Sequence, residues 1–208
     1  MDFRYLLIAR FVLVNLVSFA ILFAVYLQGW LDGMFVTNIA ELIAVIVAVF
    51  IYGLVLCGAK VWRTSIELND IKTGSPPSAS RAGKYFASIY GNDEEGRLIS
   101  AETLRTRLIS RIAIVRHIAN SLVFLGLIGT VIGFIIALSA VDPNATASAD
   151  TVAPVIARLI NGMSIALYTT LVGAVLHVWL TVNHRILSTG TVNLYSAIIE
   201  LGESRGRA

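Results

Sequence analysis

Four long apolar segments stand out along the chain, separated by more polar stretches. They cover residues 5–27, 39–59, 118–141 and 160–180. A helix needs about 20 predominantly apolar residues to cross the hydrocarbon core of a membrane. The fourth segment is the most polar of the four, because five side chains interrupt it: Asn161, Ser164, Thr169, Thr170 and His177. The pattern predicts an all-α integral membrane protein with four transmembrane helices.

The third and fourth helices are expected to extend beyond the bilayer. From Ser100 onward, apolar side chains recur at steps of three and four residues up to the third segment: Leu104, Leu108, Ile112, Val115 and Ala119. This spacing is typical of an amphipathic helix, and no helix breaker separates it from the span. The fourth helix is expected over 154–187, with Pro154 in its first turn and Asp150 or Thr151 as its N-cap.

Turns separate these helices. The segments 28–38 and 142–151 are short, so they are expected to join the first two and the last two spans as hairpins. Between the hairpins, residues 75–78 contain two prolines and form a break, and residues 91–96 form an acidic turn. The expected organisation has four parts: a peripheral transmembrane hairpin over 1–60, a cytoplasmic helical segment over 61–117, a pore-lining hairpin over 118–187 and a cytoplasmic tail over 188–208.

Composition narrows the class of protein. Of the 208 residues, 57% are hydrophobic and only 14% are charged, whereas soluble domains carry about 25% charged residues. The excess of apolar residues speaks against a soluble enzyme, and no catalytic Ser/His/Asp arrangement or zinc motif supports a membrane-embedded enzyme. The single Cys57 allows no disulfide within the chain, and we expect neither a metal site nor a cofactor.

The basic residues predict the orientation in the membrane. Of the 16 Lys and Arg residues, only Arg158 falls outside the N-terminus, the segment between the hairpins and the C-terminus. Loops rich in Lys and Arg stay in the cytoplasm, so both termini are expected there. The net charge of +3 reflects this topology and does not indicate nucleic-acid binding. Arg4 and Arg10 precede an apolar run, as in a signal peptide, but that run is too long and no small-residue cleavage site precedes Gln28.

Four arginines lie on the amphipathic segment before the third span: Arg105, Arg107, Arg111 and Arg116. Their charges suit anionic lipid headgroups or acidic residues of a partner, and they equally suit simple anchoring on the cytoplasmic side. The sequence leaves both interpretations open.

The two hairpins differ in the size of their side chains. The first two spans carry bulky apolar residues on nearly every face, which is typical of helices that face lipid. The third and fourth spans carry small residues at helical spacing: Gly126, Gly129, Gly133 and Ala137 on the third, and Gly162, Ala166, Gly173 and Ala174 on the fourth. Because small residues let helix backbones approach closely, these positions are predicted to pack helices together or to face a pore.

Hydroxyl side chains accompany both small-residue faces. At 1.5 Å per residue, Thr130 lies about 18 Å from the start of the third span, and Thr170 about 15 Å from the opposite membrane face. In a hydrocarbon core about 30 Å thick, both fall near the midplane. Thr169 adds a third hydroxyl, about 100° around the fourth helix. The three threonines are candidates for a polar lining, with helix packing as the alternative.

Neither the third nor the fourth span contains a carboxylate. Ion paths through membranes normally use ionisable groups, and a hydroxyl cannot hold a proton between transfers. If ions cross here, we expect another polypeptide to supply the titrating carboxylate. His177, about 10 Å from Thr170 towards the cytoplasm, is a candidate proton relay or a packing residue. Glu41, near the outer end of the second span, is expected to reach the membrane interface.

The last two spans contain two strings that resemble the MotA/TolQ/ExbB proton-channel family: Leu125-Gly-Leu-Ile-Gly-Thr-Val-Ile-Gly-Phe134 and Gly162-Met-Ser-Ile-Ala-Leu-Tyr-Thr-Thr-Leu-Val-Gly173. The resemblance covers roughly residues 100–187. It implies a homopentamer in the bacterial inner membrane around two copies of a single-span partner, similar to MotB, ExbD or TolR, whose membrane aspartate takes up the ion. Thr130 matches the threonine of the Gly-Thr-Val motif, and Thr170 matches the threonine after Ala-Leu-x-x. Both are therefore implied to line the ion path.

In this family, ion flow is converted into mechanical work by a motor or stator. Four spans resemble the MotA/PomA branch, whereas Ile165 and Trp179 stand where TolQ and ExbB have glutamate and usually proline. The Thr169-Thr170 pair resembles the double threonine of sodium-driven members, but proton drive is commoner, so H⁺ is preferred and Na⁺ stays open. The alternative from another class is a non-conducting membrane scaffold that assembles through its glycine-rich helix faces.

Overall fold

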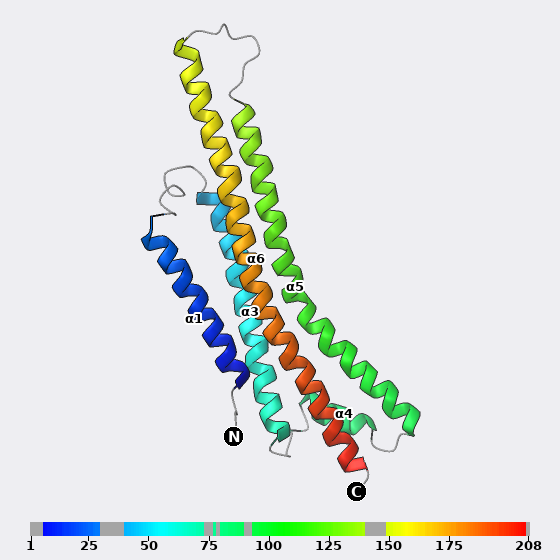
Figure 1. Ribbon diagram of the computed structural model, residues 1–208. Coiled ribbons are helices and arrows are strands. Elements are labelled where there is room, and N and C mark those ends of the chain that lie inside the picture. Colours follow the sequence, from blue (N-terminus) through cyan, green and yellow to red (C-terminus); the bar gives the residue numbers. More distant parts are fainter. Residues whose placement is uncertain are drawn as a thin grey trace. The chain divides into compact units, whose positions relative to one another are not determined.

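The computed structural model describes residues 6–29, 40–72, 77, 80–89, 93–139 and 149–206, and all regular structure in these residues is helical. The helices are α1 (Leu6–Leu27), α3 (Ala40–Lys72), α4 (Arg81–Ile89), α5 (Glu94–Leu138) and α6 (Ala149–Gly206) (Figure 1). Four of them, all except α4, are long and apolar enough to cross a membrane. The predicted all-α fold with four membrane-spanning helices is therefore confirmed.

The two C-terminal helices are much longer than a membrane span. α5 has 45 residues and α6 has 58, which correspond to about 68 Å and about 87 Å at 1.5 Å per residue. The hydrocarbon core of a bilayer is only about 30 Å thick. The prediction that these helices are long enough to extend beyond the bilayer is therefore confirmed.

Both ends of α6 differ from the sequence-based expectation. The helix begins at Ala149, ahead of 154, so that Asp150 and Thr151 lie inside it and do not cap it, and Pro154 lies beyond its first turn. α6 also continues past 187 to Gly206, through the segment expected to be a tail. The C-terminal part of α6 is helical because its apolar residues recur at helical spacing and are fully buried. These residues are Leu187, Leu194 and Ile198.

Most of the predicted connections lie outside the described residues. This applies to the hairpin turn after Gly29, to the turn at 142–148 and to most of the break at 75–78. Of the predicted acidic turn at 91–96, the last three residues belong to α5. Gly29 has a positive φ of 73° and its N–H donates to the carbonyl of Tyr26. A glycine in this conformation is a common end for a helix such as α1.

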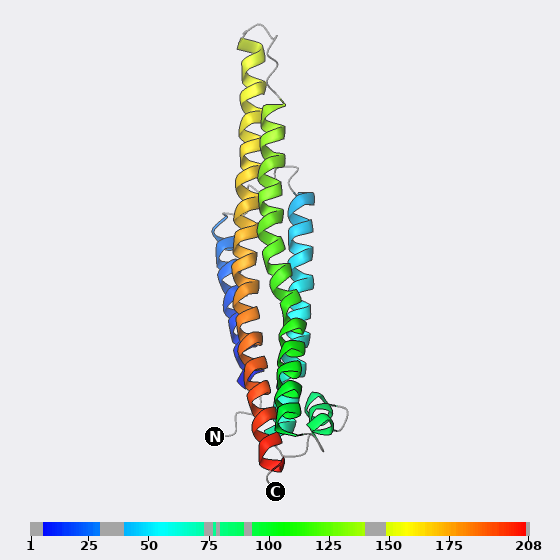
Figure 2. The ribbon, with the colours of Figure 1, turned by 90° about the vertical axis from the view of Figure 1, so that its right-hand side faces the viewer.

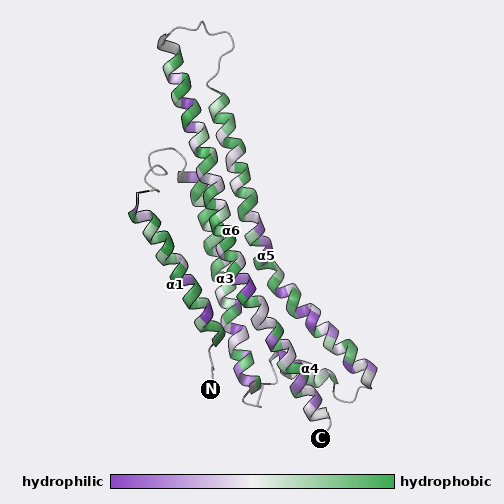
Figure 3. Cartoon of the chain, in the orientation of Figure 1, coloured by the Kyte–Doolittle hydropathy of each residue, from purple (hydrophilic) through white to green (hydrophobic). Residues whose placement is uncertain are grey.

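The chain divides into two compact units, and α1, α3, α5 and α6 each contribute to both. Unit 1 comprises Met1–Val17, Leu54–Arg116 and Val182–Ala208, and unit 2 comprises Ser18–Gly53 and His117–Thr181. Figure 3 shows mostly hydrophobic residues along the helix segments of unit 2, whereas hydrophilic residues gather on those of unit 1. Unit 2 therefore contains the helix segments that are hydrophobic enough to lie in a membrane.

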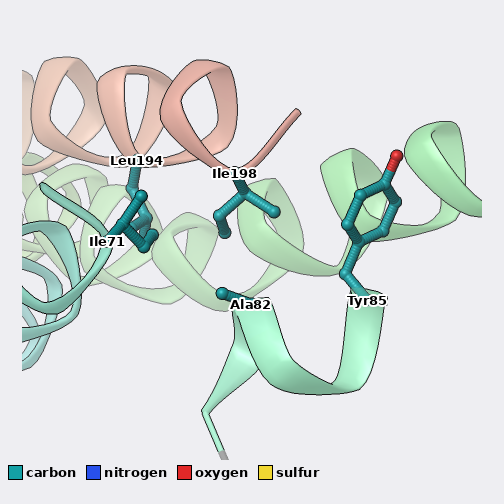
Figure 4. Packing of buried hydrophobic residues seen from close by; sticks show 5 residues of the cluster. All are labelled: Ile71, Ala82, Tyr85, Leu194 and Ile198. Carbon is teal, nitrogen blue, oxygen red and sulfur yellow. The ribbon is translucent and has the colours of Figure 1, made fainter. Parts of the chain in front are cut away.

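The core of unit 1 joins α3, α4 and the end of α6. Five buried residues form it: Ile71, Ala82, Tyr85, Leu194 and Ile198 (Figure 4). The short helix α4 is capped by Ser80, whose Oγ accepts a hydrogen bond from the N–H of Gly83 at 3.0 Å. The amphipathic helix α4 thereby packs Ala82 and Tyr85 against Ile71 of α3 and against Leu194 and Ile198 of α6.

Candidate functional site

Small residues bring α5 and α6 into close contact in unit 2, where the two helices lie side by side (Figures 1 and 2). A Cβ atom on Gly162 would lie 2.5 Å from the carbonyl oxygen of Gly133 and from the amide nitrogen of Ala137. A Cβ atom on Gly173 would lie 2.7 Å from the carbonyl oxygen of Leu122. These distances are too short for any side chain, so the glycines permit backbone contact between the helices.

Most of the small residues singled out in the sequence are buried in this contact: Gly126, Gly129, Gly133 and Ala137 on α5, and Gly162, Ala166 and Gly173 on α6. Ala174 differs, because it is exposed. Within one chain, the buried set packs α5 against α6. Large apolar side chains such as Leu127, Phe134 and Leu167 are exposed on the same two helices.

Two of the three candidate threonines meet at the edge of this helix contact. The hydroxyl oxygens of Thr130 on α5 and Thr170 on α6 form a short hydrogen bond. Both hydroxyls also approach the carbonyl oxygen of Gly126, at 3.2 Å from Thr130 Oγ1 and 3.4 Å from Thr170 Oγ1. Thr130 is half-buried and Thr170 is exposed, so the pair is open on one side.

The hydrogen-bonding capacity of this pair is not used up. Two hydroxyls carry two protons and four acceptor lone pairs. One proton lies in the contact between Thr130 and Thr170, and the second is satisfied by the Gly126 carbonyl. Three lone pairs then remain without a donor among the described residues. The pair can therefore accept a hydrogen bond from a donor group or coordinate a small cation. It cannot take up or release a proton itself.

Thr169 lies elsewhere, although it is the direct neighbour of Thr170. Its side chain is fully buried, and its hydroxyl donates within α6 to the carbonyl of Ile165 at 2.9 Å or of Ala166 at 3.2 Å. A Cβ atom on Gly129 would lie 2.5 Å from Thr169 Cβ. The side chain of Thr169 thus fills the space that Gly129 leaves, and the structure does not bring its hydroxyl to the Thr130–Thr170 pair.

His177 is tied to α5 by a hydrogen bond between its Nδ1 and the carbonyl oxygen of Ala119, at 2.8 Å. Because a carbonyl oxygen only accepts, this contact requires the proton to be on Nδ1. The ring is half-buried. Glu41 is exposed in the first turn of α3. Among the described residues, no three His, Cys, Asp or Glu side chains are close enough to hold a metal ion.

Two residues that depart from the TolQ and ExbB pattern attach the other helices to α6. Ile165 is buried against Ile43 of α3. Trp179 is 5% exposed, with its ring centroid 4.8 Å from that of Phe19 on α1 and 4.9 Å from that of Phe50 on α3. Sequence reasoning missed this aromatic cluster, because nothing in the spacing of three residues so far apart predicts that they meet.

The comparisons with known proteins agree with the motifs on α5 and α6. The model of the MotA/TolQ/ExbB proton channel family matches residues 93–198. This range contains α5, the Thr130–Thr170 pair and most of α6. No curated protein and no solved structure matches the chain. This multi-pass membrane protein therefore belongs to the MotA/TolQ/ExbB proton channel family.

Proposed function

We propose that this chain is the ion-conducting subunit of a proton-driven membrane motor. In this proposal a homopentamer surrounds two copies of a single-span partner in the bacterial inner membrane, with both termini of the chain in the cytoplasm. An aspartate of the partner carries the ion past Thr130 and Thr170, and ion flow is converted into mechanical work. The observation that carries the proposal is the hydroxyl pair itself, which is open on one side and has unused lone pairs.

The chemistry of the pair explains why a partner is needed. Along the third and fourth spans the chain has no carboxylate, and threonine cannot release or store a proton at physiological pH. The two hydroxyls can lower the cost of bringing an ionisable group to the middle of a membrane, because they hydrogen-bond to its charged and its neutral forms. One chain supplies the hydroxyls of this site but no titratable group. In the proposed complex, a carboxylate from another chain faces the pair and completes the site. Family membership supports the same arrangement, because members work with partner proteins in channel complexes.

Protons suit the geometry better than sodium ions. Sodium needs several oxygen ligands, which membrane proteins often supply from carbonyl groups of unwound helices. Here α6 is continuous across the site, and the buried hydroxyl of Thr169 donates to its own helix. This chain therefore offers two hydroxyl oxygens and few others, a set that supports proton transfer with the partner carboxylate. The proposed path therefore uses Thr130 and Thr170 alone, and the role predicted for Thr169 from the sequence stays a prediction that Thr169→Val tests.

The scaffold alternative receives less support from the packing. It requires the glycine-rich faces to join separate copies of the chain. The close contacts of Gly133, Gly162 and Gly173 are instead made between α5 and α6 of a single chain. Within one chain, these faces are already occupied by the packing of α5 against α6.

The proposal is tested by reconstituting the chain with its single-span partner in liposomes and measuring proton uptake with a pH-sensitive dye. We expect uptake only when both proteins are present, and its loss when the partner's membrane aspartate is replaced by asparagine. A parallel experiment with a sodium indicator distinguishes the two ions. Uptake by the chain alone, or no uptake by an assembled complex, would contradict the proposal.

A further inference from the structure

Unit 1 contains a cavity of about 540 Å³ between α3, α4 and α5. Five cationic side chains line it: Arg63 from α3, Arg81 and Lys84 from α4, and Arg107 and Arg111 from α5. Among the residues that the structure describes, Glu67 is the only carboxylate in the lining. The net charge of the whole chain is only +3, so positive charge is strongly concentrated at this cavity.

The single carboxylate is already engaged. Glu67 Oε2 lies 3.3 Å from Arg81 Nε, and both side chains are largely buried. Burial lowers the pKa of Arg81, Glu67 opposes this effect, and the nearby charges of Arg111 and Arg63 lower the pKa further. The remaining four cations of the lining have no carboxylate within ion-pair distance in the part of the chain that the structure describes.

A second cavity of about 230 Å³ shares three of these arginines, Arg63, Arg81 and Arg111. It also reaches Leu56, Ala59 and Lys60. Leu56 and Ala59 belong to the last turn of the apolar segment 39–59, and Lys60 follows it directly. On α5, Arg111 lies about 10 Å before the start of the third span at Ile118. The cationic lining therefore begins where the apolar segments end.

We propose that this cavity binds the phosphate headgroup of an anionic membrane lipid. Guanidinium and ammonium groups from three helices match the charge and the hydrogen-bonding capacity of a phosphodiester. The hydroxyl of Ser100 lines the same cavity and adds a further donor. Basic cavities next to the cytoplasmic ends of spans are where anionic headgroups bind to membrane proteins.

The apolar part of the lining favours a lipid over a soluble phosphate. Leu104 and Leu108 line the larger cavity, and Leu56 and Ala59 line the smaller one. These side chains contact an acyl chain or a glycerol backbone well, and they add nothing to the binding of a free anion. The larger cavity has a volume of about 540 Å³. This lies within the range of about 300 to 1,000 Å³ that is typical of ligand pockets. This site is built from unit 1 and does not depend on the proposed ion path in unit 2.

Native mass spectrometry of the purified full chain tests the site by titration with phosphatidylglycerol, phosphatidylcholine and inorganic phosphate. The test variant is Arg107→Gln/Arg111→Gln, which removes two exposed cations from the cavity. The control is Arg105→Gln/Arg116→Gln, which removes two exposed cations from the same helix but outside both cavities. Melting temperatures of both variants establish that they remain folded.

We expect saturable binding of phosphatidylglycerol, little binding of phosphatidylcholine, and an affinity at least about tenfold lower in the test variant. In the control, affinity stays within about twofold of the wild-type value. Equal losses in both variants would show a general attraction to positive charge and overturn the proposal. The proposal is also overturned if binding does not distinguish the two lipids, or if millimolar inorganic phosphate displaces phosphatidylglycerol and thereby identifies a site for soluble phosphate.

Discussion

The hydroxyl groups of Thr130 and Thr170, forty residues apart in the sequence, are in direct hydrogen-bond contact at the edge of the α5–α6 interface. Both also approach the carbonyl oxygen of Gly126. The contact is possible because glycines allow the two helix backbones to touch. Helix packing and the proposed ion path are therefore two consequences of the same small-residue faces, and substitutions can separate them.

Replacing Gly162 by alanine should destabilise the protein. The new methyl group would lie 2.5 Å from backbone atoms of Gly133 and Ala137, which cannot rotate away. Overpacking of this kind costs about 1–3 kcal/mol. Thermal unfolding of the detergent-purified chain should therefore begin at a lower temperature.

The control for this substitution is Gly58→Ala. A Cβ atom there would lie 3.4 Å from the ring of Phe11, which is an ordinary contact. Alanine is also the better helix former by about 0.8–1.0 kcal/mol, so this variant should be at least as stable as the wild type. Equal effects of the two substitutions would contradict the packing described for α5 and α6.

Trp179 should be a major source of stability in unit 2. It packs its buried ring against Phe19 and Phe50, and truncation of a buried tryptophan to alanine costs about 3–5 kcal/mol. Trp62 provides the control, because its side chain is 60% exposed. We expect a large fall in melting temperature for Trp179→Ala and a small one for Trp62→Ala. A similar fall for both would show that the aromatic cluster does not hold α1 and α3 to α6.

A buried amide pair should couple α1 to α6 in unit 1. Asn15 Nδ2 donates to Asn183 Oδ1 at 2.8 Å and to the carbonyl of Phe11 at 2.8 Å. Replacing either asparagine by leucine leaves the other amide buried without this partner, at a cost of about 1–3 kcal/mol. The double Leu variant should lose less stability than the sum of the single variants. Strictly additive losses in a double-mutant cycle of unfolding would argue against the coupling.

Much of the fold follows from the sequence because it depends on local spacing. Apolar runs predict the four spans, and the steps from Leu104 to Ala119 correctly predict that α5 extends ahead of its span. The continuation of α6 to Gly206 was missed, because Leu194 and Ile198 gain their burial from α4, which is distant in the sequence. Their spacing alone does not reveal that partner.

The candidate site was only partly predictable, for a related reason. Helical periodicity gives the depth of Thr130 and Thr170 and the angle between Thr169 and Thr170. It does not say which of the two adjacent threonines is buried against α5 and which lies at the edge of the interface. The answer depends on Gly129, which leaves room for the buried Thr169 side chain and thereby turns Thr170 to the edge of the interface. The cationic cavity needs α4 beside α3 and α5, a tertiary arrangement that no motif in the sequence signals.

Ion flux through valine variants of the assembled complex tests the central claim most directly. Valine matches the shape of threonine but has no hydroxyl. On the proposed path, Thr130→Val/Thr170→Val removes the hydrogen bonds to the partner's carboxylate. Since bonds to charged groups contribute about 1.5–3 kcal/mol, proton flux should then fall at least about tenfold. In Thr169→Val the lost hydroxyl donates only to its own helix, so flux should stay within about twofold of the wild-type value. Flux that survives in the double variant, or that disappears in Thr169→Val, with the complex intact, would contradict the account.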